Sequence, residues 1–181
     1  MARVGVIGLG NIGGAVATNL VADGDEVVVA DIDPARAAAV AGATAGDVAA
    51  VAAASEITLT SLPRPEDVAG VASAWAAAAP AGAILLDLST SSPAANRALA
   101  ETLAATGHHF VEAPLTGGAI GARNRSLVFM VGGADEPVAR CLPVLDRLGR
   151  ATFHLGPVGA GTTMKLVNSL LALTCTWVSL E

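Results

Sequence analysis

Residues 3–13 read RVGVIGLGNIG, and this stretch decides the fold. It joins a short apolar run, Arg3 to Ile7, to the pattern G-x-G-x-x-G, which spans Gly8 to Gly13. An alanine-rich segment with helical character follows, and a second apolar run from Glu26 to Ala30 ends on Asp31. The order predicts a strand, a glycine-rich turn, a helix and a second strand that ends on an acidic residue. This is the βαβ unit that binds dinucleotides.

The glycine-rich turn and Asp31 have separate expected tasks. The residues expected to contact the cofactor here are Gly8, Leu9, Gly10, Asn11, Ile12, Gly13 and Asp31. The three glycines should allow the tight turn, the approach of a pyrophosphate and the close packing of helix on strand, and the helix N-terminus should face the phosphates. The Asp31 carboxylate can accept hydrogen bonds from a ribose 2′-OH and would repel a 2′-phosphate, so we expect NAD rather than NADP. A glycine turn that closes an ordinary hairpin is the alternative, and the complete βαβ context argues against it.

Composition limits the class of protein. A chain of 181 residues is long enough for one well-buried domain, or for one domain and part of another. The apolar share of 53% against 14% charged residues argues against disorder. With a net charge of −6 and no cluster of Lys or Arg, we expect neither nucleic acid nor an anionic membrane as a partner. The most apolar run, Leu166 to Leu180, is shorter than the roughly 18 residues that span a bilayer.

The cysteines and histidines indicate no special chemistry. Cys141 and Cys175 form no C-x-x-C motif and lie in apolar stretches, so we interpret both as reduced core residues of a cytoplasmic protein. The N-terminus has a strand where a secretory signal would have its apolar region. His108 and His109 are adjacent and would point to opposite faces of a strand, so we expect no metal site.

Beyond Asp31, strands and helices alternate. The expected helices are Pro34 to Val40, Asp47 to Ala54, Pro65 to Ala79, Pro93 to Ala105 and Asp135 to Leu148, with Asp33, Asp47 and Ser92 able to cap three of them. The expected strands are Ala43–Thr44, Glu56 to Thr60, Ala83 to Leu86, His109 to Glu112, Leu127 to Gly132 and Ala151 to His154. The alternation predicts an α/β fold with a Rossmann-type, doubly wound and mostly parallel sheet.

Two loops are candidates for ligand contact. The loop Ser61 to Pro65 follows a strand, and ligands of open α/β sheets bind beyond the carboxyl ends of strands, so this loop should face the cofactor. A plain proline-rich connection is the alternative. In the loop Ala113 to Gly118, two glycines after a hydroxyl residue expose backbone N–H groups, which suits an anion such as a carboxylate.

Lys165 is the only lysine in the chain. It lies near the start of an apolar helix expected from Thr162 to the C-terminus, with Asn168 three residues later on the same face. A lysine in such surroundings is a usable proton donor or acceptor, and Asn168 could hold its ammonium group or a substrate oxygen. A surface lysine at a helix start is the alternative. Because the helix is apolar on nearly all sides, something outside this sequence should cover it.

The chain resembles the β-hydroxyacid dehydrogenase family, which includes 3-hydroxyisobutyrate, tartronate semialdehyde and 6-phosphogluconate dehydrogenases. Four segments carry the resemblance, in the family's order along the chain. They are Gly8 to Gly13 with Asn19–Leu20, Asp87 to Thr90, Ala113 to Gly118 leading to Phe129 to Gly133, and Gly159 to Gly161 followed by Lys165 and Asn168.

The resemblance implies an oxidoreductase that transfers a hydride between NAD and a small 3-hydroxy acid, such as 3-hydroxyisobutyrate or tartronate semialdehyde. It implies that Lys165 is the catalytic general acid and base and that Asn168 orients the substrate. The implied substrate-binding residues are Ser89, Thr116, Gly117 and Gly118, and those implied beside the nicotinamide are Leu62, Pro63 and Thr90. The chain departs from the family at Thr116, where serine is usual, at Arg125, near which a glycine is usual, and at Ser169, where Asn or Gln is usual.

The resemblance also implies a domain organisation. Residues 1–158 would be the dinucleotide-binding domain and residues 159–181 the start of an interdomain helix. The family continues into an all-helical domain that closes the active site and supplies the dimer interface, and this sequence lacks it. Because an exposed apolar helix makes a monomer improbable, we expect a homo-oligomer formed through the C-terminal helix.

Two other functions remain open at this point. The chain could bind NAD without turning over any substrate by itself, because the C-terminal domain is missing. It could also resemble the imine reductase branch of the same superfamily. That branch typically replaces the lysine and favours NADP, so Lys165 and Asp31 both argue against it.

Overall fold

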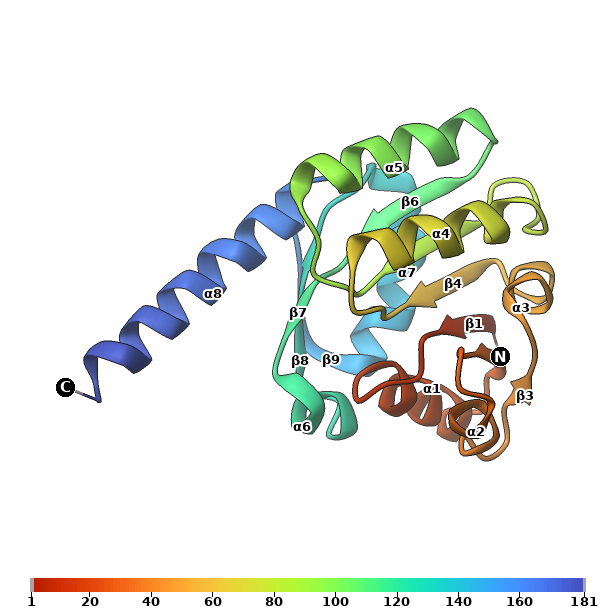
Figure 1. The fold of residues 1–181 in the computed structure, drawn as a ribbon, viewed down its shortest axis with the longest axis horizontal. Coiled ribbons are helices and arrows are strands. Elements are labelled where there is room, and N and C mark those ends of the chain that lie inside the picture. Colours follow the sequence, from red (N-terminus) through yellow and green to blue (C-terminus); the bar gives the residue numbers. More distant parts are fainter. Residues whose placement is uncertain (1, 181) are drawn as a thin grey trace.

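Six parallel strands form the central sheet in the order β3-β2-β1-β4-β5-β6 (Figure 1). The computed structural model describes residues 2–180. The strands are β1 (Arg3–Ile7), β2 (Glu26–Ala30), β3 (Thr44–Ala45), β4 (Ile57–Thr60), β5 (Ile84–Asp87) and β6 (His109–Glu112). The chain winds outward from β1 in one direction and then, from β4, in the other, so the predicted doubly wound parallel sheet is confirmed.

Helices cover both faces of this sheet. They are α1 (Gly13–Ala22), α2 (Pro34–Ala38), α3 (Val48–Ala54), α4 (Pro65–Ala76), α5 (Pro93–Ala105) and α7 (Asp135–Leu148). Ile84 and Leu86 of β5 share one buried cluster with α1 and α7, whereas Leu85 belongs to a second cluster with α3, α4 and α5. Successive strand residues point to opposite faces, so a continuous apolar run is buried on both sides. Trp75, interpreted from the sequence as a packing residue, is fully buried in the second cluster.

The capping residues predicted from the sequence form the expected bonds. Asp33, Asp47 and Ser92 accept from the backbone N–H groups of Ala35, Ala50 and Ala95 at 3.0, 2.7 and 3.1 Å. Most boundaries differ from the prediction by one to three residues, and two of them illustrate this. The short strand is Thr44–Ala45 rather than Ala43–Thr44, and α4 ends at Ala76 rather than at Ala79, ahead of Pro80. Pro80 disfavours the helical conformation at Ala79, and the backbone N–H groups of Ala78 and Ala79 both donate to the Trp75 carbonyl oxygen in a turn that follows the helix.

A second, three-stranded sheet stands beside the first. It consists of β7 (Leu115–Thr116), β8 (Leu127–Val131) and β9 (Gly149–His154), with β7 antiparallel and β9 parallel to β8. The sequence predicted β8 and β9 but a loop over residues 113–118, where the structure has β7 and the start of α6 (Gly118–Arg123). A strand of two residues is too short to show a periodic pattern, so only its pairing with β8 defines it.

Arg125, near which the family usually has a glycine, adopts the backbone conformation that glycine favours. Its φ is 55°, in the left-handed region. Its guanidinium donates to both carboxylate oxygens of Asp23 at 2.7 and 2.9 Å and to the carbonyl oxygen of Asn19 at 3.0 Å. The side chain thus links the turn before β8 to the end of α1, and these bonds offset the cost of the strained backbone.

The last helix, α8 (Ala160–Val178), projects away from the rest of the molecule (Figure 1). Its apolar side chains are exposed over most of its length, with Leu173 and Trp177 each 71% exposed. Cys175 is exposed on this helix, so its predicted core position was wrong, whereas Cys141 is buried as expected. The difference arises because only the first turn of α8 packs against the rest of the molecule, whereas the part that carries Cys175 is exposed within residues 2–180. None of the helices in this range combines the length and apolar content needed to cross a bilayer.

A buried carboxyl group lies at the carboxyl ends of β4 and β5. Asp87 is fully buried, and its Oδ1 accepts from the Thr60 hydroxyl at 2.8 Å and from the Ser89 backbone N–H at 3.1 Å. Its Oδ2 has no hydrogen-bond partner among residues 2–180. Burial raises the pKa of Asp87 above its ordinary value of 3.8, and the nearby charge of Glu112 adds to the rise.

This raised pKa predicts how Asp87→Asn changes the pH dependence of stability. A carboxyl group whose pKa is higher in the folded than in the unfolded chain favours folding below the unfolded value of 3.8. That contribution is lost as the pH rises through the folded value. The free energy of unfolding of Asp87→Asn, relative to the parent chain, should therefore increase from pH 4 to pH 8, by about 1 kcal/mol or more. Urea unfolding at several pH values measures it. The exposed Asp146→Asn is the control, and a profile for Asp87→Asn that runs parallel to the parent would contradict the assignment.

Candidate functional site

A cavity of about 360 Å³ opens at the carboxyl edge of the central sheet. Five segments that are distant in sequence line it, and Lys165 is the only charged residue among them. The lining residues are Ile12, Ser61, Leu62, Leu88, Ser89, Thr90, Leu115, Thr116, Gly117, Gly118 and Lys165. Eight of these were singled out from the sequence as cofactor, substrate or catalytic residues, namely Ile12, Leu62, Ser89, Thr90, Thr116, Gly117, Gly118 and Lys165. The fold thus brings them to one place, and their roles remain predictions.

The glycine-rich turn lies where β1 meets α1. Gly8 has a φ of 87°, and a Cβ on it would collide with the carbonyl oxygen of Ser61. A Cβ on Gly13 would collide with the carbonyl oxygen of Gly8, so α1 can approach β1 this closely only without a side chain there. Gly10, by contrast, is exposed and has no atom within 4 Å of its would-be Cβ. The outer glycines are therefore required by packing, and the middle one leaves the backbone open to a ligand.

Asp31 holds the end of β2 to this turn. Its Oδ2 accepts from the Leu9 backbone N–H at 2.6 Å, its Oδ1 accepts from the Asp33 backbone N–H at 2.9 Å, and its side chain is only 5% exposed. Arg36 lies 3.9 Å from Oδ2. The neighbouring Ile32 is fully exposed. The carboxylate therefore has a structural role besides the ribose contact predicted for it.

The loops after β4 and β5 are tied together. The Leu62 backbone N–H donates to Ser89 Oγ at 2.9 Å, and the Ser89 backbone N–H donates in turn to Asp87. Side chains that line the cavity are thus held by the buried Asp87 beneath them. Pro63, predicted to lie beside the cofactor, is exposed and is not one of the lining residues.

The opposite wall is formed by the loop that joins β7 to α6. Gly117 and Gly118 both have positive φ values, 117° and 58°, and Gly117 is the N-cap residue of α6. Any residue with a side chain would be strained at position 117 or 118, which accounts for the two glycines that follow Thr116. Lys165 supplies a positive charge to the same cavity. The glycines of this loop and the Lys165 side chain therefore line one cavity.

Several predicted residues lie outside the cavity lining. Asn168 is half-buried on α8, and the remaining cofactor residues lie along the glycine-rich turn and at Asp31. Sequence reasoning missed a buried polar cluster below Lys165, which consists of Asn96, Glu112 and Thr162. A polar residue at the end of an apolar strand was the one available signal, and it does not reveal contacts 50 residues apart. Within residues 2–180, no group of three or more side chains suited to metal ligation is present.

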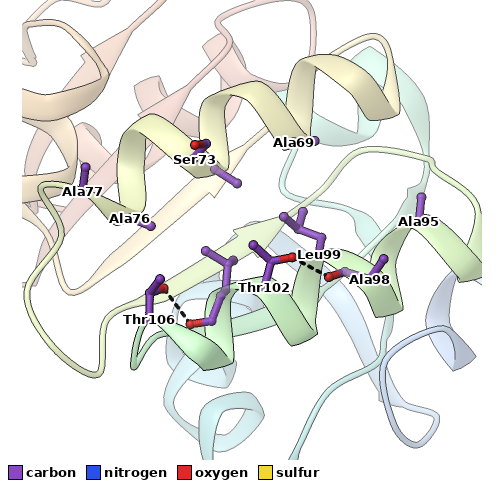
Figure 2. A pocket seen from close by; sticks show the side chains of 11 residues that line it. Ala69, Ser73, Ala76, Ala77, Ala95, Ala98, Leu99, Thr102 and Thr106 are labelled. Atoms are coloured by element: carbon purple, nitrogen blue, oxygen red, sulfur yellow. Dashed lines mark hydrogen bonds between the residues drawn. The ribbon is translucent and has the colours of Figure 1, made fainter.

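A larger cavity of about 570 Å³ lies between α4 and α5 (Figure 2). Its labelled side chains are mostly alanines, and the hydroxyls of Thr102 and Thr106 bond back to the carbonyls of Ala98 and Leu103 in their own helix. The cavity thus presents a small-residue, apolar wall with no charged group and no residue at a strand end. We assign no chemistry to it.

Comparison with known proteins identifies relatives along the chain. Residues 3–156 match the family described as the NAD binding domain of 6-phosphogluconate dehydrogenase. The chain is 38% identical to 2-(hydroxymethyl)glutarate dehydrogenase of Eubacterium barkeri, over 98% of this chain and 61% of that protein. It is 36% identical to 3-hydroxyisobutyrate dehydrogenase of Pseudomonas aeruginosa, over 94% of this chain and 59% of that protein.

A solved structure agrees with these relatives. Mycobacterium tuberculosis 3-hydroxyisobutyrate dehydrogenase with L-serine superposes with a TM-score of 0.92 and 31% identity, over 95% of this chain and 60% of that one. The chain therefore spans about 60% of the length of the relatives it matches. Together with the glycine-rich βαβ unit and the sheet order, these matches show that the chain belongs to the β-hydroxyacid dehydrogenase family, with an NAD-binding domain over residues 3–156.

Proposed function

We propose that this protein oxidises a small 3-hydroxy acid with NAD as the hydride acceptor. The observation that carries the proposal is the single cavity that Lys165 shares with the glycines after Thr116 and with the loops after β4 and β5. Two of the relatives are 3-hydroxyisobutyrate dehydrogenases, and the solved structure holds L-serine; 3-hydroxyisobutyrate and L-serine both carry a hydroxyl group on the β-carbon. The proposed substrate belongs to this class, and examples are 3-hydroxyisobutyrate or, in the reverse direction, tartronate semialdehyde.

Each group has a proposed task. Bound NAD supplies the hydride acceptor, and the protein supplies position and charge. The backbone N–H groups of Gly117 and Gly118 and the Thr116 hydroxyl hold the substrate carboxylate. Lys165 Nζ takes the proton of the substrate hydroxyl group as the hydride leaves the same carbon, and returns it in the reverse reaction. Asn168 orients the substrate from the next turn of α8.

A second candidate function is NAD binding without turnover by the 181-residue chain alone. The exposed apolar surface of α8 favours it, because Lys165 and Asn168 lie on that helix and nothing in residues 2–180 covers its far half. We infer that a further domain or a second copy covers α8 in the active protein, as an oligomer formed through this helix would. NADH binding with no oxidation of any 3-hydroxy acid would support the second candidate for the chain alone.

Substitution of Lys165 separates proton transfer from charge. We expect Lys165→Ala to reduce turnover about 100-fold or more, the usual contribution of a positioned acid or base, with little change in NADH affinity. Lys165→Arg should be equally inactive, because a guanidinium keeps the charge but cannot release its proton at neutral pH. Absorbance at the NADH band measures turnover, and fluorescence titration measures affinity. The exposed Arg150→Ala should behave like the parent. A large loss of NADH affinity in Lys165→Ala would instead assign the lysine a structural role.

Asp31→Ala tests the preference for NAD. Loss of the carboxylate removes the proposed ribose contact and the repulsion of a 2′-phosphate, so the ratio of the dissociation constants for NADPH and NADH should fall by about tenfold. The ratio is the useful quantity, because any loosening of the glycine-rich turn through loss of the Leu9 bond affects both cofactors alike. Asp47→Ala, which removes a helix cap elsewhere, is the control. An unchanged ratio in Asp31→Ala would refute the assignment.

A further inference from the structure

A buried carboxylate lies beneath the first turn of α8. Glu112, the last residue of β6, has no exposed surface. Its Oε1 accepts from the backbone N–H groups of Gly159 and Thr162 at 2.8 and 3.1 Å. Its Oε2 accepts from Asn96 Nδ2 at 2.6 Å and from the Thr162 hydroxyl at 2.8 Å. Each carboxylate oxygen therefore accepts two hydrogen bonds, and three of the four donors belong to the start of α8.

The Glu112 side chain caps the N-terminus of α8, although Glu112 is distant in sequence. The N-cap residue itself is Gly159, which has no side chain to accept from the first turn. The N-terminal N–H groups of a helix need acceptors, and a negative charge at this end is favoured by the helix dipole. The carboxylate that supplies both comes from 47 residues earlier in the chain. Charged acceptors form stronger hydrogen bonds than neutral ones, so this cap fixes the first turn firmly.

Two further contacts hold the same turn. Asn96 of α5, also buried, donates to Glu112 and to Thr162 Oγ1, the latter at 2.9 Å, so that α5, β6 and α8 share one network. The backbone of Gly161 lies against β8, where a Cβ on it would collide with the carbonyl oxygen of Met130. Packing and charge thus locate the first turn on the sheet.

Lys165 follows this anchored turn directly. It stands three residues after Thr162, on the next turn of α8, and reaches the cavity that Thr116 and the two following glycines line. From Leu170 onward, α8 leaves the body of the molecule and its side chains are exposed. The position of the Lys165 amine is therefore set from one end of the helix only, within the part of the chain that the structure describes.

We propose that Glu112, held by Asn96 and Thr162, is a positioning residue that places Lys165 in the cavity by fixing the first turn of α8. The inference rests on the proton-transfer role proposed above for Lys165. It predicts that loosening the network moves the lysine while leaving the cofactor-binding turn intact, because the glycine-rich turn and Asp31 share no hydrogen bond with this network.

The chain offers a matched pair of substitutions. Thr162→Val removes the hydroxyl that joins Asn96 to Glu112. Thr58→Val removes an equally buried hydroxyl from β4. That hydroxyl forms hydrogen bonds with Trp75 of α4 and with Ser55 at the end of α3. Both changes delete one buried hydroxyl from the core, and only the first lies in the network under α8. Thr162→Ser restores the hydroxyl, and Glu112→Gln is a second test variant should Thr162→Val fail to fold.

Two readouts on the 181-residue chain report the position of α8 without requiring turnover. Hydrogen exchange of the amides at residues 160–163 should be roughly tenfold faster in Thr162→Val than in the parent, as expected for one lost buried hydrogen bond. In Thr58→Val, the exchange of these amides should change no more than that of the amides in the sheet. Because Lys165 is the only lysine, its 13C-methylated amine gives one lysine side-chain resonance. That resonance should shift and sharpen in Thr162→Val and should return to the parent position in Thr162→Ser.

Turnover in the active protein completes the test. Thr162→Val should lower kcat roughly tenfold with KM and NADH affinity unchanged, and Thr58→Val should leave kcat unchanged. Identical exchange and Lys165 resonances in Thr162→Val, Thr58→Val and the parent would overturn the positioning role even if Lys165 is essential. Conversely, if Lys165→Ala retains full turnover, the proposed function fails, while the exchange and resonance data still decide whether Glu112 anchors α8.

Discussion

The parallel pairing of β1 with β2 and β4 is the constraint on which the site depends. It places the carboxyl ends of these strands, and of β5 beside them, at one edge of the sheet. The loops that leave this edge are then joined by specific bonds, from Leu9 to Asp31 and from Leu62 to Ser89. Because parallel strands require crossover connections, each loop comes from a separate βα unit. One sheet edge thereby gathers cavity-lining residues from Ile12 to Thr90, which are distant in sequence.

The second requirement is a close approach of backbones. α1 lies against β1 at Gly13, and α8 lies against β8 at Gly161, in both cases so closely that a Cβ would meet a carbonyl oxygen. The cavity lining accordingly includes Ile12, the N-cap residue of α1, and Lys165, which lies in the second turn of α8. The N-terminus of α1 has no side-chain cap, whereas that of α8 is capped by the buried Glu112. This difference fits the proposed roles, which are a cofactor contact at the start of α1 and the positioning of Lys165 on α8.

Local chemistry explains which parts could be predicted from the sequence. The caps at Asp33, Asp47 and Ser92, the glycine-rich turn and the apolar runs of the central strands are all encoded within a few residues, and the prediction found each of them. The two-residue β7, the helix that starts at Gly118 and the network around Glu112 depend on partners far along the chain, so no local pattern reveals them. Cys175 was misplaced for a related reason, because an apolar helix predicts a burial partner and not its identity.

The central claim is that the first βαβ unit binds a dinucleotide beside Lys165. Titration of the 181-residue chain with NADH, followed by the change in nicotinamide fluorescence and by competition with NAD, tests it most directly. The account predicts saturable binding of one NADH per chain that NAD displaces. Fluorescence that rises without saturation, or that NAD fails to displace, would contradict the role of residues 8–13 and with it the assignment of the cavity.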